Sequence, residues 1–214
     1  MVFLFCYDRT MEFTTNSRDY LNQSAVGYMI NTLLSESARN EIKSLQDTFV
    51  SEFKDSIWIT PEDALHITLL DWLAPLVDYG DDKDQVFKKI SSEYSTTLTS
   101  ILETIEPIDL TFNKMIVSSS AIAIIADDKG TEIFNNIRQR FLEKIDLLPN
   151  TKQPPSIVHS TIARFVGEIA LDNVKQFATT LDVSVAEQVN SFQLVRETTL
   201  PMLNYSVIKE YLLT

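Results

Sequence analysis

Two short stretches, Leu65-His66-Ile67-Thr68-Leu69 and Val158-His159-Ser160-Thr161-Ile162, share one pattern: apolar, His, any residue, Thr, apolar. The chain has no other histidine. Side chains two residues apart lie on the same face of a strand, so each stretch presents an imidazole and a hydroxyl together. The apolar flanks favour strands in a packed interior. We therefore predict that the two strands meet and form one catalytic cleft.

The repetition of the pattern is what makes it informative. A single histidine on an apolar strand is usually a core residue whose nitrogens are hydrogen bonded. Thr occupies 20 of the 214 positions. The chance that both histidines carry Thr two residues later is then roughly one in a hundred. Two copies that use every histidine of the chain favour a functional site over two unrelated core residues.

Apolar spacing along the chain predicts an alternation of strands and helices. Helices are predicted over 36–53, 81–103, 131–145 and 171–181. Residues 2–7 are predicted to form a short strand or an extended arm, and the other predicted strands are 26–34, 57–59, 65–70, 108–117, 120–126, 157–165, 192–198 and 205–213. Residues 71–80 are predicted to form an irregular loop, and 183–192 a lead-in to the next strand. The order of elements is similar in the two halves. We expect each half to contribute one motif to a shared groove, which explains why the two histidines are 93 positions apart.

Composition narrows the class of partner. The net charge is −12 and the isoelectric point is about 4.6, so the surface repels long nucleic acids, whose affinity comes from phosphate contacts with Lys and Arg. This favours a small nucleotide or an RNA 3′ end over a long duplex. Four glycines, with neither GxGxxG nor GK[ST], argue against a phosphate-binding glycine loop.

Other features set expectations for the environment of the chain. Cys6 is the only cysteine, which rules out an intrachain disulfide and fits the cytoplasm. We interpret Cys6 as a buried apolar residue of the first strand. No stretch reaches about 18 apolar residues, so we expect no membrane span. We expect the chain to be a monomer.

The duplicated motif, His66-Ile67-Thr68-Leu69 and His159-Ser160-Thr161-Ile162, resembles that of the 2H phosphoesterase superfamily. This group includes LigT-like RNA 2′,3′-cyclic phosphodiesterases, plant cyclic phosphodiesterases and 2′-5′ oligoadenylate phosphodiesterases. Ala163-Arg164 after the second motif is similar to the family's HxTxAR. The likeness spans residues 26–213, so we expect a single bilobal domain over 26–214 preceded by an N-terminal extension over 1–25.

The resemblance implies an α+β fold of two pseudo-symmetric lobes, in which antiparallel sheets line a central cleft and the helices lie outside. It also implies hydrolysis of a phosphodiester without a metal or another cofactor. His66 and His159 are then the catalytic pair, and Thr68 and Thr161 bind the phosphate. Arg164 matches the family's arginine, but strict strand alternation puts it out of phase with His159.

The chemistry needs an acid and a base, and imidazole serves as either near neutral pH. We assign His159 as base and His66 as acid as a hypothesis. Arg164, Tyr205 and Trp72 are candidates for substrate contact; Trp72 would stack on a base, although packing is the commoner role of such an aromatic. The alternatives are a hydrolase of cyclic or 2′-5′ oligonucleotide immune signals, a non-catalytic nucleotide-binding module, and RNA-end joining, which the charge disfavours.

Overall fold

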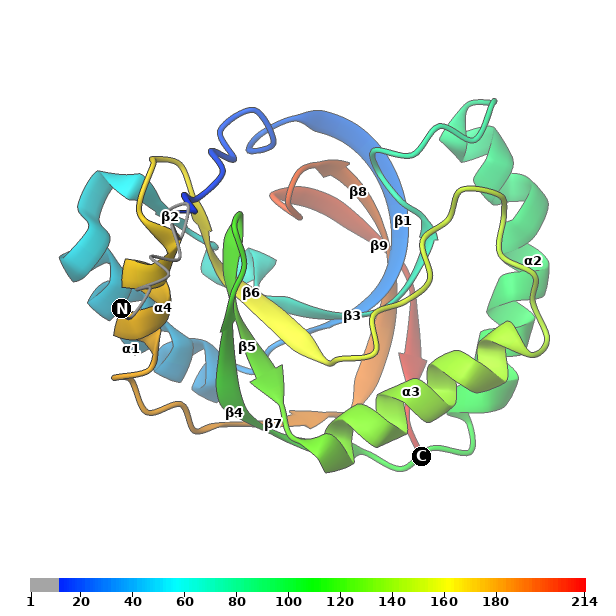
Figure 1. Cartoon of the computed structure of the whole chain (residues 1–214). Coiled ribbons are helices and arrows are strands. Elements are labelled where there is room, and N and C mark those ends of the chain that lie inside the picture. Colours follow the sequence, from blue (N-terminus) through cyan, green and yellow to red (C-terminus); the bar gives the residue numbers. More distant parts are fainter. Residues whose placement is uncertain (1–11) are drawn as a thin grey trace, which may run out of the picture.

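The computed structural model describes residues 12–214 and shows an α+β protein with two antiparallel sheets. The sheets face each other across the centre of the molecule, and the helices lie outside them (Figure 1). This confirms the predicted fold class. The strand predicted over 2–7, with Cys6, lies outside the described residues. Among the described residues, no helix is long and apolar enough to cross a membrane.

The first sheet has four strands in the order β3-β1-β8-β9. They are β1 (Ser24–Leu33), β3 (His66–Leu73), β8 (Ser191–Thr199) and β9 (Asn204–Leu212). Helix α2 (Lys83–Leu102) packs against β1 and β9, and helix α3 (Asp128–Leu142) packs against β3. The first motif strand, β3, therefore lies at one edge of this sheet.

The second sheet has five strands in the order β2-β6-β5-β4-β7. They are β2 (Ile57–Ile59), β4 (Ile108–Val117), β5 (Ala121–Ala126), β6 (His159–Phe165) and β7 (Val185–Val189). Helix α1 (Glu36–Phe53) packs against β2, β6 and β7, and helix α4 (Leu171–Ala178) packs against β4. The second motif strand, β6, contacts β3 of the other sheet, as the sequence predicted.

Local sequence signals explain where the long helices begin. At the start of α1, the Ser35 side chain accepts a hydrogen bond from the Ala38 N–H. In the same way, Asp82 accepts from the Gln85 N–H at the start of α2, and Asp127 accepts from the Gly130 N–H at the start of α3. Such caps satisfy N–H groups that have no partner within the helix. Short 3₁₀ turns, Lys54–Ser56 and Glu62–Ala64, lead into β2 and β3.

Each half of the sequence contributes one motif strand to the shared cavity, as predicted, but neither sheet is built from one half alone. The last two strands, β8 and β9, complete the first sheet, and β2 from the N-terminal half joins the second sheet. Strand β7 was also missed, although Val185, Glu187 and Val189 alternate inward. Apolar patterns show which strands are buried, but pairing depends on contacts between distant segments.

Candidate active site

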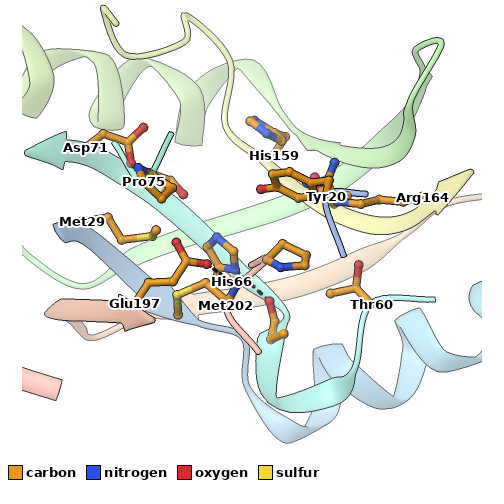
Figure 2. A pocket seen from close by; sticks show the side chains of 14 residues that line it. Tyr20, Met29, Thr60, His66, Asp71, Pro75, His159, Arg164, Glu197 and Met202 are labelled. Carbon is orange, nitrogen blue, oxygen red and sulfur yellow. Dashed lines mark hydrogen bonds between the residues drawn. The ribbon is translucent and has the colours of Figure 1, made fainter. Parts of the chain in front are cut away.

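A cavity of about 210 Å³ lies between the two sheets and contains both motifs. The cavity is lined by Tyr20, Met29, Thr60, Ala64, His66, Thr68, Asp71, Pro75, His159, Thr161, Arg164, Glu197, Pro201 and Met202. In Figure 2, Arg164 and Thr60 lie to one side of the histidines, and Asp71 and Glu197 lie to the other. The structure thus brings together the four motif side chains predicted from the sequence.

The two motif strands carry the same irregularity. In the pairing of β1 with β3, Ile30 is opposite Leu70 and Asn31 is opposite Thr68, so Leu69 is an extra residue. In the pairing of β5 with β6, Ile162 is extra in the same way. Both extra residues stand three positions after the histidine. A bulge of this kind reverses the alternation of side chains beyond it.

The bulges decide which residues face the cavity. The fifth residue after each histidine lies beyond the bulge and faces the cavity. This residue is Asp71 in β3 and Arg164 in β6. Arg164 therefore lies on the same face as His159, against the expectation from strict alternation. Trp72, predicted to contact substrate, instead points into the core with 0% of its surface exposed and packs against Tyr94 and Phe141. Trp72 also belongs to β3 and not to the predicted loop.

A buried polar side chain satisfies the extra carbonyl of each bulge. Arg138 of α3 donates from Nε to the Leu69 carbonyl at 2.9 Å, and Gln46 of α1 donates from Nε2 to the Ile162 carbonyl at 2.8 Å. Arg138 is 3% exposed and Gln46 is 2% exposed. A buried carbonyl without a donor is costly, so Arg138 stabilises the bulge of β3. At the bulge of β6 the Ile162 carbonyl also accepts from the Thr60 backbone N–H at 3.0 Å, and Gln46 adds a second donor. Neither Arg138 nor Gln46 was identified from the sequence.

Arg138 also connects the two motifs. Its guanidinium donates to the Thr68 carbonyl at 2.9 Å, and to the carbonyls of Pro155 and Ile157 at 2.8 and 3.2 Å. The last two carbonyls belong to the segment that leads into His159. Burial lowers the pKa of Arg138 to about 10, so the side chain is still charged at neutral pH. One buried cation thus holds β3 and the start of β6 together.

The histidines are held as neutral rings. His66 donates from Nδ1 to the Ala64 carbonyl at 2.7 Å, because a carbonyl can only accept, and this leaves Nε2 free. Burial lowers the pKa of His66, while that hydrogen bond opposes the shift. The pKa of His159 is lowered by burial and then by the positive charges of His66, Arg138 and Arg164. At neutral pH either imidazole can accept a proton.

Two carboxyl groups line the opposite side of the cavity. Burial raises the pKa of Asp71, which Lys152 partly offsets. Burial also raises the pKa of Glu197 to about 7, although its carboxylate accepts a hydrogen bond from the Met202 backbone N–H. Glu197 is 2% exposed. Both residues were missed from the sequence. A bulge turns Asp71 toward the cavity, and Glu197 of β8 reaches the cavity through the pairing of distant strands, and neither feature leaves a recognisable motif.

Two uncharged side chains complete the side that holds Arg164. The Arg164 guanidinium carbon lies 4.6 Å from the centre of the Tyr20 ring. The Thr60 hydroxyl lines the cavity and has no hydrogen-bond partner within the described part of the chain. Tyr205, the remaining predicted contact, is not among the lining residues; its hydroxyl donates to the Asp63 carbonyl at 3.3 Å. Across residues 12–214, no three His, Cys, Asp or Glu side chains cluster in a way that could hold a metal.

The architecture and the paired motif strands define the LigT-like, 2H phosphoesterase fold. The protein TT0787 of Thermus thermophilus matches with a TM-score of 0.61 and 16% identity, over 87% of this chain and 97% of that protein. Apo LigT of E. coli matches with a TM-score of 0.54 and 13% identity, over 90% and 99% of the two chains.

Further structures of E. coli LigT are complexes with ATP, NADP⁺, phosphate and 3′-AMP. At these identities the likeness establishes the fold. No family model matches the sequence, and a sequence comparison with curated proteins finds no match.

Proposed function

We propose that the protein is a metal-independent phosphodiesterase. It hydrolyses a 2′,3′-cyclic phosphate or a 2′-5′ phosphodiester of a small nucleotide or an RNA 3′ end. The observation that supports this most is the shared cavity, in which two histidines, two threonines and Arg164 converge from two sheets. The nucleotide complexes of E. coli LigT add support from a protein of the same fold.

Hydrolysis of a cyclic phosphate requires two proton transfers. A water oxygen forms a bond to phosphorus while the bond from phosphorus to one ribose oxygen breaks. One imidazole takes the proton from the attacking water, and the other gives a proton to the departing ribose oxygen. Histidines that come from strands of different sheets would approach the phosphorus from opposite sides in this mechanism. The atoms and charges balance with no other reactant than water.

The environments of the two rings support His159 as base and His66 as acid. The pKa of His159 is lowered by burial and by neighbouring cations, and this favours the neutral ring that a base must be. Burial lowers the pKa of His66 as well, and the hydrogen bond from its Nδ1 to the Ala64 carbonyl opposes that shift. No such opposing bond acts on His159 among the described residues, so we assign His66 as the acid. A bound phosphate would raise the pKa of both rings, which allows one of them to be protonated in the complex.

Charge on the phosphate oxygens grows as the reaction proceeds, and groups fixed toward these oxygens lower the barrier. Thr68 and Thr161 would donate from their hydroxyls, and Arg164 would supply a positive charge. Burial lowers the pKa of Arg164, although not enough to neutralise a guanidinium, which stays charged in proteins. Arg164 therefore serves as a fixed cation at the phosphate.

A substrate panel tests this proposal. The purified full chain is incubated, with and without EDTA, with 2′,3′-cyclic mononucleotides, 2′-5′ and 3′-5′ oligoadenylates, cyclic dinucleotides and RNA with cyclic phosphate ends. We expect turnover of a cyclic or 2′-5′ substrate that EDTA does not change. Loss of activity in EDTA would contradict the metal-free mechanism. Turnover of only cyclic dinucleotides or 2′-5′ oligoadenylates would indicate a signal hydrolase, and binding without turnover would indicate a nucleotide-binding module.

A further inference from the structure

Residues 12–23, here called the N-terminal strap, cross from one sheet to the other before β1 begins. In Figure 1 this segment is the blue trace that arcs between the β6 and α4 side and the start of β1. The sequence motifs lie elsewhere, so nothing in them predicts what this segment does. Its contacts place it at one end of the candidate active site.

One part of the strap is fixed to the chain that follows β6. The Thr14 hydroxyl donates to the Gly167 carbonyl at 2.8 Å and accepts from the Ile169 N–H at 2.9 Å. The Ser17 N–H donates to the Phe165 carbonyl at 2.8 Å, directly after Arg164 in the sequence. Further bonds join the Arg18 Nε to the Val166 carbonyl and the Leu171 N–H to the Glu12 carbonyl.

The other end of the strap is fixed to the turn between β8 and β9. The Asn22 N–H donates to the Leu200 carbonyl at 2.9 Å, and the Leu200 N–H donates to the Gln23 carbonyl at 3.0 Å. The next two residues of this turn, Pro201 and Met202, line the cavity. The strap therefore bridges the two sheets where Arg164 and this turn form the edge of the cavity.

Tyr20 lies between these two anchors and forms part of the cavity wall. Its ring covers the Arg164 guanidinium, with 4.6 Å between the guanidinium carbon and the ring centre (Figure 2). Burial raises the pKa of the Tyr20 hydroxyl, so the side chain is an uncharged wall at neutral pH. Tyr20 and the backbone of the strap thus form the wall of the cavity beside Arg164.

We propose that the strap closes this end of the cleft and that Tyr20 restricts the enzyme to phosphates at the end of a molecule, namely 2′,3′-cyclic phosphates. This inference rests on the proposed function. Both ester oxygens of a 2′,3′-cyclic phosphate belong to one ribose, so the rest of the substrate leaves in one direction. A phosphate inside a 2′-5′ chain carries a nucleoside on each side and needs two openings.

The test compares three probes on the full chain: 2′,3′-cyclic AMP, a short RNA ending in a 2′,3′-cyclic phosphate, and a 2′-5′-linked triadenylate. We expect kcat/KM for the two cyclic probes to exceed that for the triadenylate by about 100-fold. Tyr20→Ala should lower the ratio of kcat/KM for the cyclic probes to kcat/KM for the triadenylate by about tenfold. Arg18→Ala removes an anchor of the strap outside the cavity, and it should lower this ratio less than Tyr20→Ala does.

The matched control is Asp19→Ala, because Asp19 is exposed on the same strap and does not line the cavity. Its ratio should equal that of the unmodified protein. Equal rates on all three probes would overturn the role of the strap while leaving the proposed function in place. An unchanged ratio in both Tyr20→Ala and Arg18→Ala, with both variants folded by circular dichroism, would also overturn it. No turnover of any probe would overturn the proposed function as well.

Discussion

Strands β3 and β6 are built alike, yet their charges differ. Each carries His, Thr two residues later and a bulge at the third position, and a buried side chain satisfies the extra carbonyl of each bulge. The fifth position after the histidine is Asp71 in β3 and Arg164 in β6. The bulge is therefore present in both strands, whereas the side chains that it turns into the cavity carry opposite charges.

Because of this difference, the two sides of the cavity carry different charged groups. Arg164 and the uncharged Tyr20 and Thr60 form one side, while Asp71 and Glu197 form the other (Figure 2). An anionic phosphate is favoured near Arg164, and hydrogen-bond donors of the substrate are favoured near the carboxyl groups. The two motif strands thus have similar backbones, although the side chains at their fifth positions carry opposite charges. Variants at matched positions of the two strands test how far the strands are equivalent.

The largest effect is expected from the histidines themselves. His66→Ala and His159→Ala should each lower kcat by about 10²–10⁴, because each removes one proton transfer, with little change in melting temperature. The two variants should differ in their pH profiles of kcat/KM. In the unmodified protein the acid limb should fall below the ordinary histidine pKa, because the pKa of His159 is lowered.

In the proposed mechanism, loss of His159 should flatten that acid limb, because His159 is the proposed base. Loss of His66, the proposed acid, should flatten the alkaline limb. The reverse pattern would exchange the two roles. A large fall in melting temperature in both variants, measured by differential scanning calorimetry, would instead indicate two structural histidines.

The next prediction compares variants of Arg164 and Asp71, the fifth residues after the two histidines. Arg164→Met should lower kcat by about 10²–10³, the loss typical of one group that stabilises a developing negative charge. Asp71→Asn should lower KM by about fivefold, the result of removing roughly 1 kcal/mol of repulsion between a carboxylate and the phosphate. Steady-state kinetics over a range of substrate concentration separates the two outcomes. Similar losses of kcat in both variants would mean that the strands contribute equally.

A smaller effect is expected from the side chains behind the bulges. Arg138→Met leaves the carbonyls of Thr68 and Leu69 without a donor and should cost about 1–3 kcal/mol of stability. It should also lower kcat by about tenfold with KM nearly unchanged, because the motif strands lose their mutual register.

Arg138→Lys should recover part of the activity, and the acid limb of the pH profile should move upward in Arg138→Met as one cation near His159 is removed. Gln46→Met is the matched control at the other bulge, where no charge is involved. An unaltered pH profile in Arg138→Met would reduce Arg138 to a purely structural role.

The smallest effect concerns stability and pH at Glu197. Its folded pKa, about 7, lies above the ordinary glutamate value of 4.5, so the folded protein holds this proton more tightly than the unfolded chain does. The free energy of unfolding should therefore fall as pH rises from about 4.5 to about 7, by at most about 3 kcal/mol, and stay level above that. Glu197→Gln, whose amide oxygen can still accept from the Met202 N–H, should remove most of this fall. Urea titrations at pH 5 and pH 8 on both proteins measure it.

The sequence predicted the local elements well where a local signal existed. Helix α1 begins and ends where predicted because Ser35 caps it and a regular apolar stripe follows. Both motif strands were found from their flanking residues. Strand β7 was missed because a five-residue alternation between polar segments is a weak signal. Arg164 was expected out of phase with His159, since the rule of alternation holds only until a bulge interrupts it. Asp71 was assigned to a loop, because β3 was predicted to end at residue 70.

The sequence by itself determined which reactive groups the protein has. They are two histidines, each with a threonine on the same face of its strand, in an acidic chain. Only the tertiary structure decided what surrounds them. The sheets are assembled from distant strands, and Arg138 and Gln46 reach across from helices to satisfy two bulged carbonyls. These contacts depend on residues up to 116 positions apart, and the spacing of nearby residues does not encode them. Through them Asp71 and Arg164 face the cavity, and Trp72 faces the core.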